Sequence, residues 1–157
     1  MRHFLTLLGA FLASICWLGN AARANHHPAV LETTIYTTKG ERLFNLELAA
    51  DEKSRAFGLM QRQELKESDG MFFLFPKAVN AAFWMKNTLI PLDMLFIDPE
   101  YKIIHIEKNA APHSLTPRSA NQQVIAVIEI AGGRAEKEGI LVGDIVRYSL
   151  PESKEIR

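Results

Sequence analysis

Short segments in which polar and apolar residues alternate, separated by turn-forming residues, account for most of residues 30–150. In residues 31–37 and again in residues 42–48, every second side chain would share one face of a strand. Gly40 between these two segments favours a tight hairpin turn. The density of such segments predicts a mainly β fold, either an antiparallel sandwich or a partly closed barrel. Further strands are expected at residues 71–75, 82–85, 94–97, 102–106, 123–130 and 144–150.

One or two short helices are expected to accompany the strands. Asp51 can cap a helix that continues to Met60. Residues 134–138 have the composition of a further helical turn, which Gly139 would end. Residues 109–122 are polar and contain two prolines, so they are expected to form a loop.

Residues 1–24 have the composition of a secretory signal peptide. A basic residue precedes an apolar stretch at residues 4–18, and alanines flank Arg23 at the positions that a signal peptidase reads. We expect cleavage before Asn25 and a mature protein in the periplasm or secreted, with no membrane association once the signal is removed. An uncleaved amino-terminal anchor is the alternative. Cys16 would leave with the signal, so the mature chain would have neither a disulfide nor a catalytic thiol.

Charge and length limit the function classes. Removing residues 1–24 takes away two basic residues and no acidic one, which leaves 16 Lys and Arg against 18 Asp and Glu. Nucleic-acid binding needs a concentrated basic surface, so no nucleic-acid partner is expected. We expect a flexible leader at residues 25–29, one β domain at residues 30–150, and a tail at residues 151–157.

Several short motifs stand in the order found in a known family, and together they extend over residues 30–150. They are RAFGLMQR at 55–62, GMFFLF at 70–75, WMKNT at 84–88, PLD at 91–93, Glu129 with the glycines at 132 and 133, and Gly143-Asp144. In this order the motifs resemble domain-of-unknown-function family 192 (DUF192). The resemblance implies a β-rich fold. It implies no reaction, because the members of the family carry no agreed activity.

A set of polar and charged residues embedded among apolar ones forms the candidate ligand site. The set comprises Arg55, Arg62, Trp84, Lys86, Asn87, Thr88 and Asp93. Two kinds of cation with an amide, a hydroxyl and a flat indole suit a small polar or anionic ligand. The structural alternative is that Arg55 and Asp93 form a buried ion pair and that Asn87 and Thr88 serve a turn. Lys86 and Trp84 favour binding, because lysine rarely packs among large apolar residues.

Two other function classes stay open. Asp93 and Glu129 could form an acid–base pair of a hydrolase, although the sequence has none of the common catalytic motifs. An exposed patch around Trp84 would instead indicate a structural or partner-binding module. We favour a non-enzymatic role without a cofactor, and the sequence leaves the oligomeric state open.

A metal site is the remaining alternative. Cleavage before Asn25 would place His27 third after a free amine, an arrangement that wraps Cu(II) or Ni(II) in a square plane. Four methionines offer soft donors for Cu(I), but methionines in β-rich cores are usually packing residues. They are Met60, Met71, Met85 and Met94.

Overall fold

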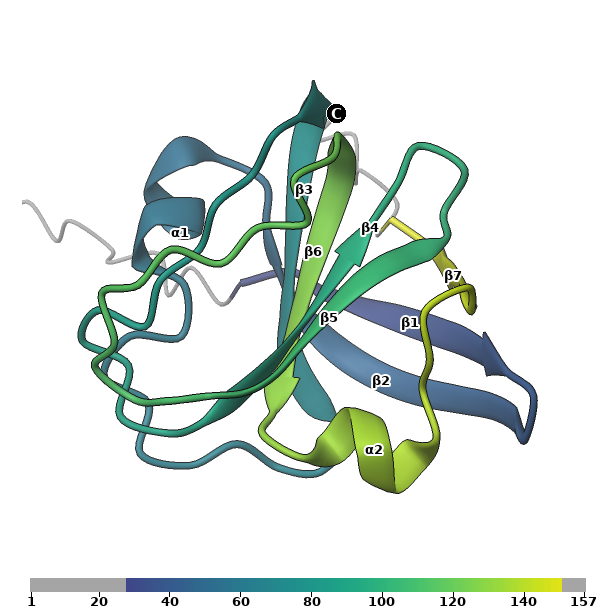
Figure 1. Cartoon of the computed structure of the whole chain (residues 1–157), viewed down its shortest axis with the longest axis horizontal. Helices are drawn as coiled ribbons and strands as arrows, with labels where there is room; N and C mark the ends of the chain where they lie inside the picture. Colours follow the sequence, from purple (N-terminus) through teal and green to yellow (C-terminus); the bar gives the residue numbers. More distant parts are fainter. Residues whose placement is uncertain (1–27, 151–157) are drawn as a thin grey trace, which may run out of the picture.

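The computed structural model describes residues 28–150, and strands dominate this part of the chain (Figure 1). The expected signal peptide and the expected tail at residues 151–157 lie outside the described residues. The elements are, in order, β1 (Val30–Thr37), β2 (Gly40–Ala49), α1 (Glu52–Phe57), β3 (Asp69–Val79), β4 (Leu92–Ile97), β5 (Ile103–Ala110), β6 (Val124–Ala131), α2 (Arg134–Glu138) and β7 (Ile145–Tyr148). Among residues 28–150, neither helix has the length and hydropathy needed to cross a bilayer.

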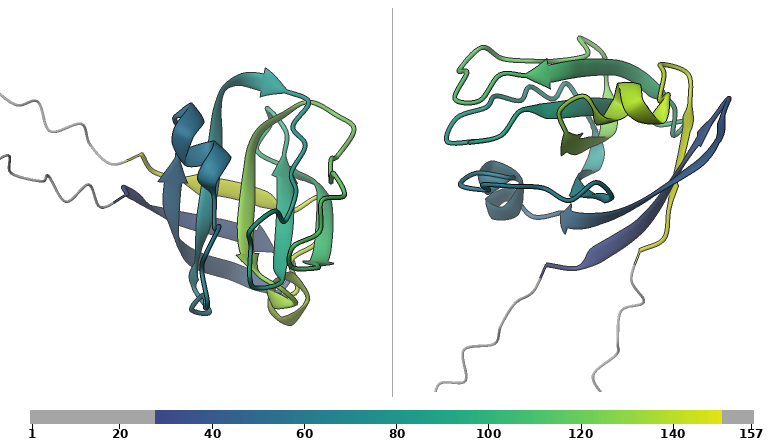
Figure 2. Two further views of the ribbon diagram at one scale, coloured as in Figure 1. Left: turned by 90° about the vertical axis from the view of Figure 1, so that its left-hand side faces the viewer. Right: turned by 90° about the horizontal axis from the view of Figure 1, so that it is seen from below.

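The strands form one sheet in the order β5-β4-β6-β3-β2-β1-β7, which curls until its two edges meet at one end (Figure 2). Backbone hydrogen bonds join these edges. Val146 donates to Tyr101 (2.8 Å), Ile103 donates to Asp144 (2.9 Å), and Gly143 donates to Ile103 (2.8 Å). Of the two predicted β architectures, the partly closed barrel is therefore confirmed, and a sandwich of two separate sheets is not formed.

One strand pair departs from the expected antiparallel arrangement. β2 and β3 run parallel, with Asn45 opposite Asp69 and Ala49 opposite Phe73. Parallel neighbours need a long crossover connection, and the segment between them supplies it with α1 and an extended loop. The alternation of polar and apolar residues gives no information on strand direction, so the purely antiparallel prediction was wrong for this pair.

Two hydrophobic clusters occupy the two faces of the sheet. The inner cluster fills the barrel and draws on every strand, whereas the outer cluster lies on β3, β4 and β6 beneath the long loops. Every residue of β4 is buried, because this strand is covered on both faces. Large side chains of the inner cluster are Leu31, Phe44, Phe72 and Leu95, and those of the outer cluster are Leu59, Phe73, Met85, Met94 and Phe96.

Two local predictions need correction. Asp51 caps α1 as expected, accepting a 2.9 Å hydrogen bond from the backbone of Ser54, but the helix ends at Phe57 rather than at Met60. Gly58, with a φ of 52°, turns the chain there. Residues 82–85 form no strand, and only Phe83 makes an isolated bridge. Met85 is buried in the outer cluster and Phe83 packs against it, because this loop covers the cluster, whereas Ala82 and Trp84 are exposed.

Candidate functional site

A cavity of about 590 Å³ lies beside α1, over the outer face of the sheet. Its walls come from α1 and the turn after it, from the end of β3, and from the loop at residues 80–88 (Figure 1). The cavity has the size of a small-molecule pocket and combines an aromatic surface with a few charged groups. Its aromatic side chains are Phe57, Phe73, Phe75, Phe83 and Trp84, and its charged ones are Glu52, Arg55, Lys77 and Glu129.

The side chain of Glu129, on β6, lies at the buried end of this cavity and is 4% exposed. Its direct neighbours across the sheet are Met71 on β3 and Met94 on β4, so the side chains beside it on both adjacent strands are apolar. Burial alone raises the pKa of the Glu129 carboxyl to about 8. At neutral pH the carboxyl therefore mostly keeps its proton.

Gly58 keeps the space above this carboxyl open. Its φ of 52° lies in the left-handed region, and a Cβ at this position would lie 3.2 Å from Cζ of Phe73 and 4.0 Å from Oε2 of Glu129. A side chain here would be strained and would extend toward the carboxyl group. The glycine thus allows the turn after α1 to pass close over Glu129 without filling the cavity.

Arg55 lines the cavity but also holds the backbone around it. Its Nη1 donates hydrogen bonds to the carbonyl oxygen of Ala50 and, at 3.0 Å, to that of Leu74. The guanidinium carbon lies 5.5 Å from the centroid of the Phe75 ring. These contacts tie α1 to β3. The expected alternative, an ion pair between Arg55 and Asp93, does not form, because each side chain bonds to backbone groups elsewhere.

The Lys-Asn-Thr segment of the WMKNT motif forms a turn. Thr88 donates its backbone N–H to the carbonyl oxygen of Met85 (3.1 Å), and Asn87 has a φ of 56°. Asparagine is one of the few non-glycine residues that adopts this left-handed conformation readily. The structural alternative for Asn87 therefore has a clear geometric basis. Thr88 is buried and lines the cavity.

Lys86 is exposed, not buried among the apolar residues that precede it. Its Nζ lies 5.4 Å from the centroid of the Trp84 ring, which is close enough for a cation–π contact. Trp84 lines the cavity and is 51% exposed. Lys86 therefore does not pack among large apolar residues, and that reason for assigning it to binding was wrong. Its side chain still positions a cation beside Trp84, a wall of the cavity.

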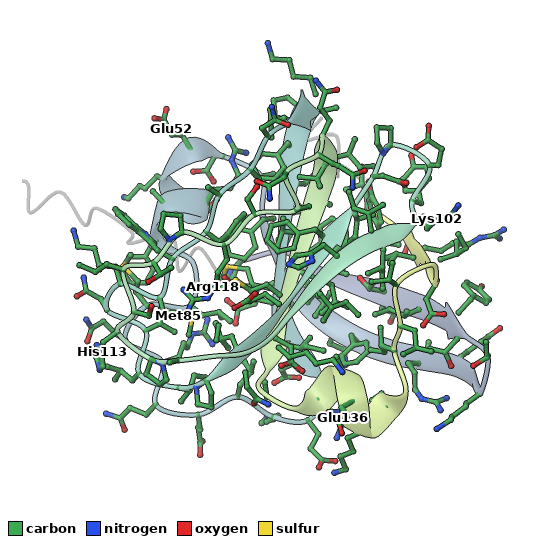
Figure 3. The ribbon with its side chains drawn as sticks, in the orientation of Figure 1. Glu52, Met85, Lys102, His113, Arg118 and Glu136 are labelled. Atoms are coloured by element: carbon green, nitrogen blue, oxygen red, sulfur yellow. The ribbon has the colours of Figure 1, made fainter. Side chains whose placement is uncertain are left out.

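Hydrogen bonds from both sides hold this turn in place. Asn87 accepts one from the backbone of Gln61 (2.9 Å), and His113 donates its backbone N–H to Thr88 (3.1 Å). Phe83 and Arg118 exchange a pair of backbone hydrogen bonds. Figure 3 shows Met85, His113 and Arg118 at this loop-covered side of the molecule, while Lys102 and Glu136 lie away from it.

Arg62 and Asp93 lie outside the cavity. Nη2 of Arg62 pairs with both carboxylate oxygens of Glu47, at 2.6 and 2.5 Å. The fully buried Asp93 carboxylate accepts backbone hydrogen bonds from Asn109 (2.8 Å), Gly133 (3.0 Å) and Ala135 (2.8 Å). Asp93 thus fixes the start of α2 against β4 and β5, as a buried structural carboxylate.

The two carboxylates considered as an acid–base pair face opposite sides of the sheet. Asp93 on β4 stands opposite Ile130 on β6, and the next pair is Met94 with Glu129. Directly opposed residues share a face, and successive residues alternate between faces. The hydrolase hypothesis based on this pair is therefore wrong.

No predicted metal ligand is brought into a cluster by the described fold. Residues 28–150 contain no group of three or more His, Cys, Asp or Glu side chains that could hold a metal ion. His27, the candidate copper ligand, lies outside the described residues. Three of the four methionines belong to the outer cluster, and Met60 lines the cavity.

Sequence reasoning missed much of the cavity. It assigned no ligand-binding role to Gly58, Lys77 or the phenylalanines, and it considered Glu129 as part of a family motif and as half of a carboxylate pair. One signal was available, because Glu129 is the single charged residue in the otherwise apolar strand Val124–Ala131. A lone acid in such a strand is rare unless it is paired or functional.

Comparison with protein-family models identifies the family. The family model DUF192, described as an uncharacterized ACR, matches residues 34–148. No curated protein matches. A solved structure from Sinorhizobium meliloti 1021, described as a candidate transcription regulator, is 34% identical, covering 77% of this chain and 95% of its own, with a TM-score of 0.75. A protein of unknown function from Novosphingobium aromaticivorans DSM 12444 is 38% identical, covering 81% and 91%, with a TM-score of 0.76. The chain belongs to the DUF192 family.

Proposed function

We propose that this protein binds a small organic molecule in the cavity beside α1. The observation that carries the proposal is Glu129, a buried carboxyl that has no charged partner among residues 28–150 and lies at the end of a cavity of about 590 Å³. Burying an ionisable group in apolar surroundings destabilises a fold, so such groups are concentrated at functional sites. A bound molecule that contacts this carboxyl would supply the missing polar partner.

The walls of the cavity suit a ligand with a flat apolar body. Phe73 and Phe83 meet edge to face, with ring centroids 4.9 Å apart, and Trp84 extends this aromatic surface toward solvent. Arg55 and Lys77 line the same cavity, and Lys86 lies over the Trp84 ring. A polar or anionic group on the outer end of the ligand would therefore meet cations. This agrees with the small polar or anionic ligand inferred from the sequence.

Other function classes have less support. The relative from S. meliloti is described as a candidate transcription regulator, but the two described helices of this chain have six and five residues, too short for a recognition helix in the major groove. A partner-binding role would use the exposed half of Trp84, and that surface is continuous with the cavity mouth. We also propose, from the composition of residues 1–24, that the mature protein acts in the periplasm or after secretion.

Mass spectrometry of protein purified under native conditions tests the binding proposal. Small molecules released on denaturation would be compared between the unchanged protein, Ala56→Trp and Lys53→Trp. Ala56 lines the cavity, whereas Lys53 is exposed on the same helix and does not. We expect the unchanged protein and Lys53→Trp to carry the same small molecule, and Ala56→Trp to lack it. Protein that carries no small molecule, or equal amounts in all three samples, would contradict the proposal.

A further inference from the structure

The buried end of the cavity offers a ligand one carboxyl group in apolar surroundings. Met71 and Met94 flank Glu129 on the sheet, and the Phe73 ring and the backbone of Gly58 close the space around it. The hydroxyl of Thr88, which also lines the cavity, already donates its hydrogen to the carbonyl oxygen of Lys86, at 3.4 Å. Of these two groups, the Glu129 carboxyl is therefore the one that can both donate a hydrogen bond to a ligand and accept one from it.

We infer that the inner end of the ligand is a neutral group that both donates and accepts a hydrogen bond, such as an amide, a lactam or a urea. This inference rests on the proposed function, because it concerns the ligand of the same cavity. A protonated carboxyl group has one donor and one acceptor side by side. A neutral amide edge presents the complementary pair, so the two groups satisfy each other through two parallel hydrogen bonds.

A cationic inner end fits this site poorly. An ammonium group carries three donors and an amidinium four, whereas a single carboxylate among methionine and phenylalanine side chains leaves some of those donors without acceptors. Forming the ion pair would also require both charges to leave water, and that desolvation offsets much of their attraction. A carboxylate inner end would place two acids together without a cation between them.

The charged groups that line the cavity with Glu129 are Glu52 and Arg55 on α1 and Lys77 on β3. None of them contributes to the shift of the Glu129 pKa, for which burial is the cause. The strands on either side present methionines. Burial of the carboxyl therefore determines the protonation state of Glu129. A neutral group bound to the protonated carboxyl should be released when the carboxyl ionises, above about pH 8.

Three probes of nearly the same shape test the inference. Benzamide, benzamidine and benzoate share a flat ring but carry a neutral, a cationic and an anionic head group. Binding to the purified protein would be followed between pH 6 and 9.5 by Trp84 fluorescence and by the backbone amide resonance of Gly58, since both residues line the cavity. We expect benzamide to bind at least about tenfold more tightly than benzamidine at pH 6.5. Its affinity should fall by about tenfold per pH unit once Glu129 is ionised.

Substitutions at Glu129 separate this explanation from others. Glu129→Gln keeps a neutral donor and acceptor, so benzamide affinity should lose its pH dependence. Glu129→Met, which has neither hydrogen-bonding group, should lose at least about tenfold in affinity. Glu136→Gln on α2, away from the cavity, is the matched control and should keep the pH profile of the unchanged protein (Figure 3).

The outcomes distinguish the inference from the proposed function. If benzamidine bound more tightly than benzamide, and Glu129→Gln lost that binding, the inference of a neutral inner end would be overturned while a ligand-binding cavity would remain. Tighter binding of benzoate than of benzamide would have the same consequence. A protein whose Gly58 resonance responds to none of the three probes, and which carries no small molecule after native purification, would overturn both.

Discussion

Asp93 on β4 accepts a 2.8 Å hydrogen bond from the backbone N–H of Ala135, 42 residues further along the chain, in the first turn of α2. The same carboxylate also binds the backbone N–H groups of Asn109 and Gly133. One buried side chain therefore holds together three segments that are distant in sequence. This relationship assigns Asp93 to stability rather than to ligand binding.

Removing this carboxylate should destabilise the protein strongly. Asp93→Ala removes the acceptor of three backbone N–H groups, one in a buried and two in part-buried hydrogen bonds, and we expect the free energy of unfolding to fall by about 3 kcal/mol. Asp98→Ala is the control, because Asp98 binds two backbone N–H groups in an exposed turn. Its cost should be about 1 kcal/mol. Urea unfolding measures both. A smaller loss for Asp93→Ala than for Asp98→Ala would contradict the structural role.

Glu129 should make stability fall as pH rises. Burial raises its pKa to about 8 in the folded protein, whereas in the unfolded chain the pKa lies near its ordinary value of 4.5. Between these values the unfolded state binds fewer protons, so the free energy of unfolding decreases from pH 4.5 to 8. The contribution of this one group should be on the order of 3 kcal/mol or more over that range.

Glu129→Gln is the variant that isolates this effect. It removes the titrating group while keeping a similar volume, so it should be more stable than the unchanged protein at pH 8 and similar to it near pH 4.5. Denaturant unfolding across this pH range provides the comparison. Parallel stability profiles for the two proteins would show that Glu129 does not titrate with a raised pKa.

The turn at Asn87 gives a test that separates backbone conformation from side-chain function. Asn87→Ala should lower the free energy of unfolding by about 1 kcal/mol, because alanine is disfavoured at a φ of 56°. Asn87→Gly should be nearly neutral, since glycine adopts this conformation without a steric cost. If both variants keep the ligand, Asn87 serves the turn. Loss of the ligand from Asn87→Gly with unchanged stability would instead assign its amide to binding.

Lys86 should matter for binding more than for stability. Its side chain is exposed, so Lys86→Met should change the free energy of unfolding by no more than about 0.5 kcal/mol. Loss of the cation over Trp84 should reduce the amount of a polar or anionic small molecule that stays bound during native purification. Lys66→Met, an exposed lysine that does not line the cavity, serves as the control. Equal retention by both variants would remove Lys86 from the site.

The proposed export has a direct measurement. Expressed from its first residue in a bacterium with a periplasm, the protein should be recovered from the periplasmic fraction with an intact mass that corresponds to a start at Asn25. A species that keeps Cys16 would contradict cleavage at this position.

Local patterns predicted the strands because alternation reports which side chains share a face. β1, β2 and β6 occur where the pattern placed them, and β6 lies in the interior of the sheet. The same pattern misplaced residues 82–85, since it cannot tell a buried strand from a loop whose apolar side chains cover a core. Nor does it determine whether β2 and β3 run parallel, which depends on the path of the chain through α1.

The candidate site was predicted only in part because it depends on contacts between distant segments. The WMKNT motif identified Trp84 and Thr88, which line the cavity with Arg55. Arg62 and Asp93 looked similar in sequence, but their partners, Glu47 and the start of α2, come from other elements. The importance of Glu129 follows from its lack of an ion-pair partner in the described part of the chain, and only the strand register reveals that its neighbours on the adjacent strands are methionines.

The position of β7 has a consequence for the protein during its synthesis. β7 pairs with β1, from Thr33 opposite Tyr148 to Tyr36 opposite Ile145, so among residues 28–150 the last strand to be made completes the edge of the first. Ile145 follows Thr37 by 108 positions, which a ribosome takes roughly 5 to 20 s to add. Throughout that interval the outer edge of β1 has no partner within its own chain, and unpaired edges readily join other chains. A chaperone that shields β1 while the rest of the protein is being made would therefore protect it when it is most exposed to aggregation.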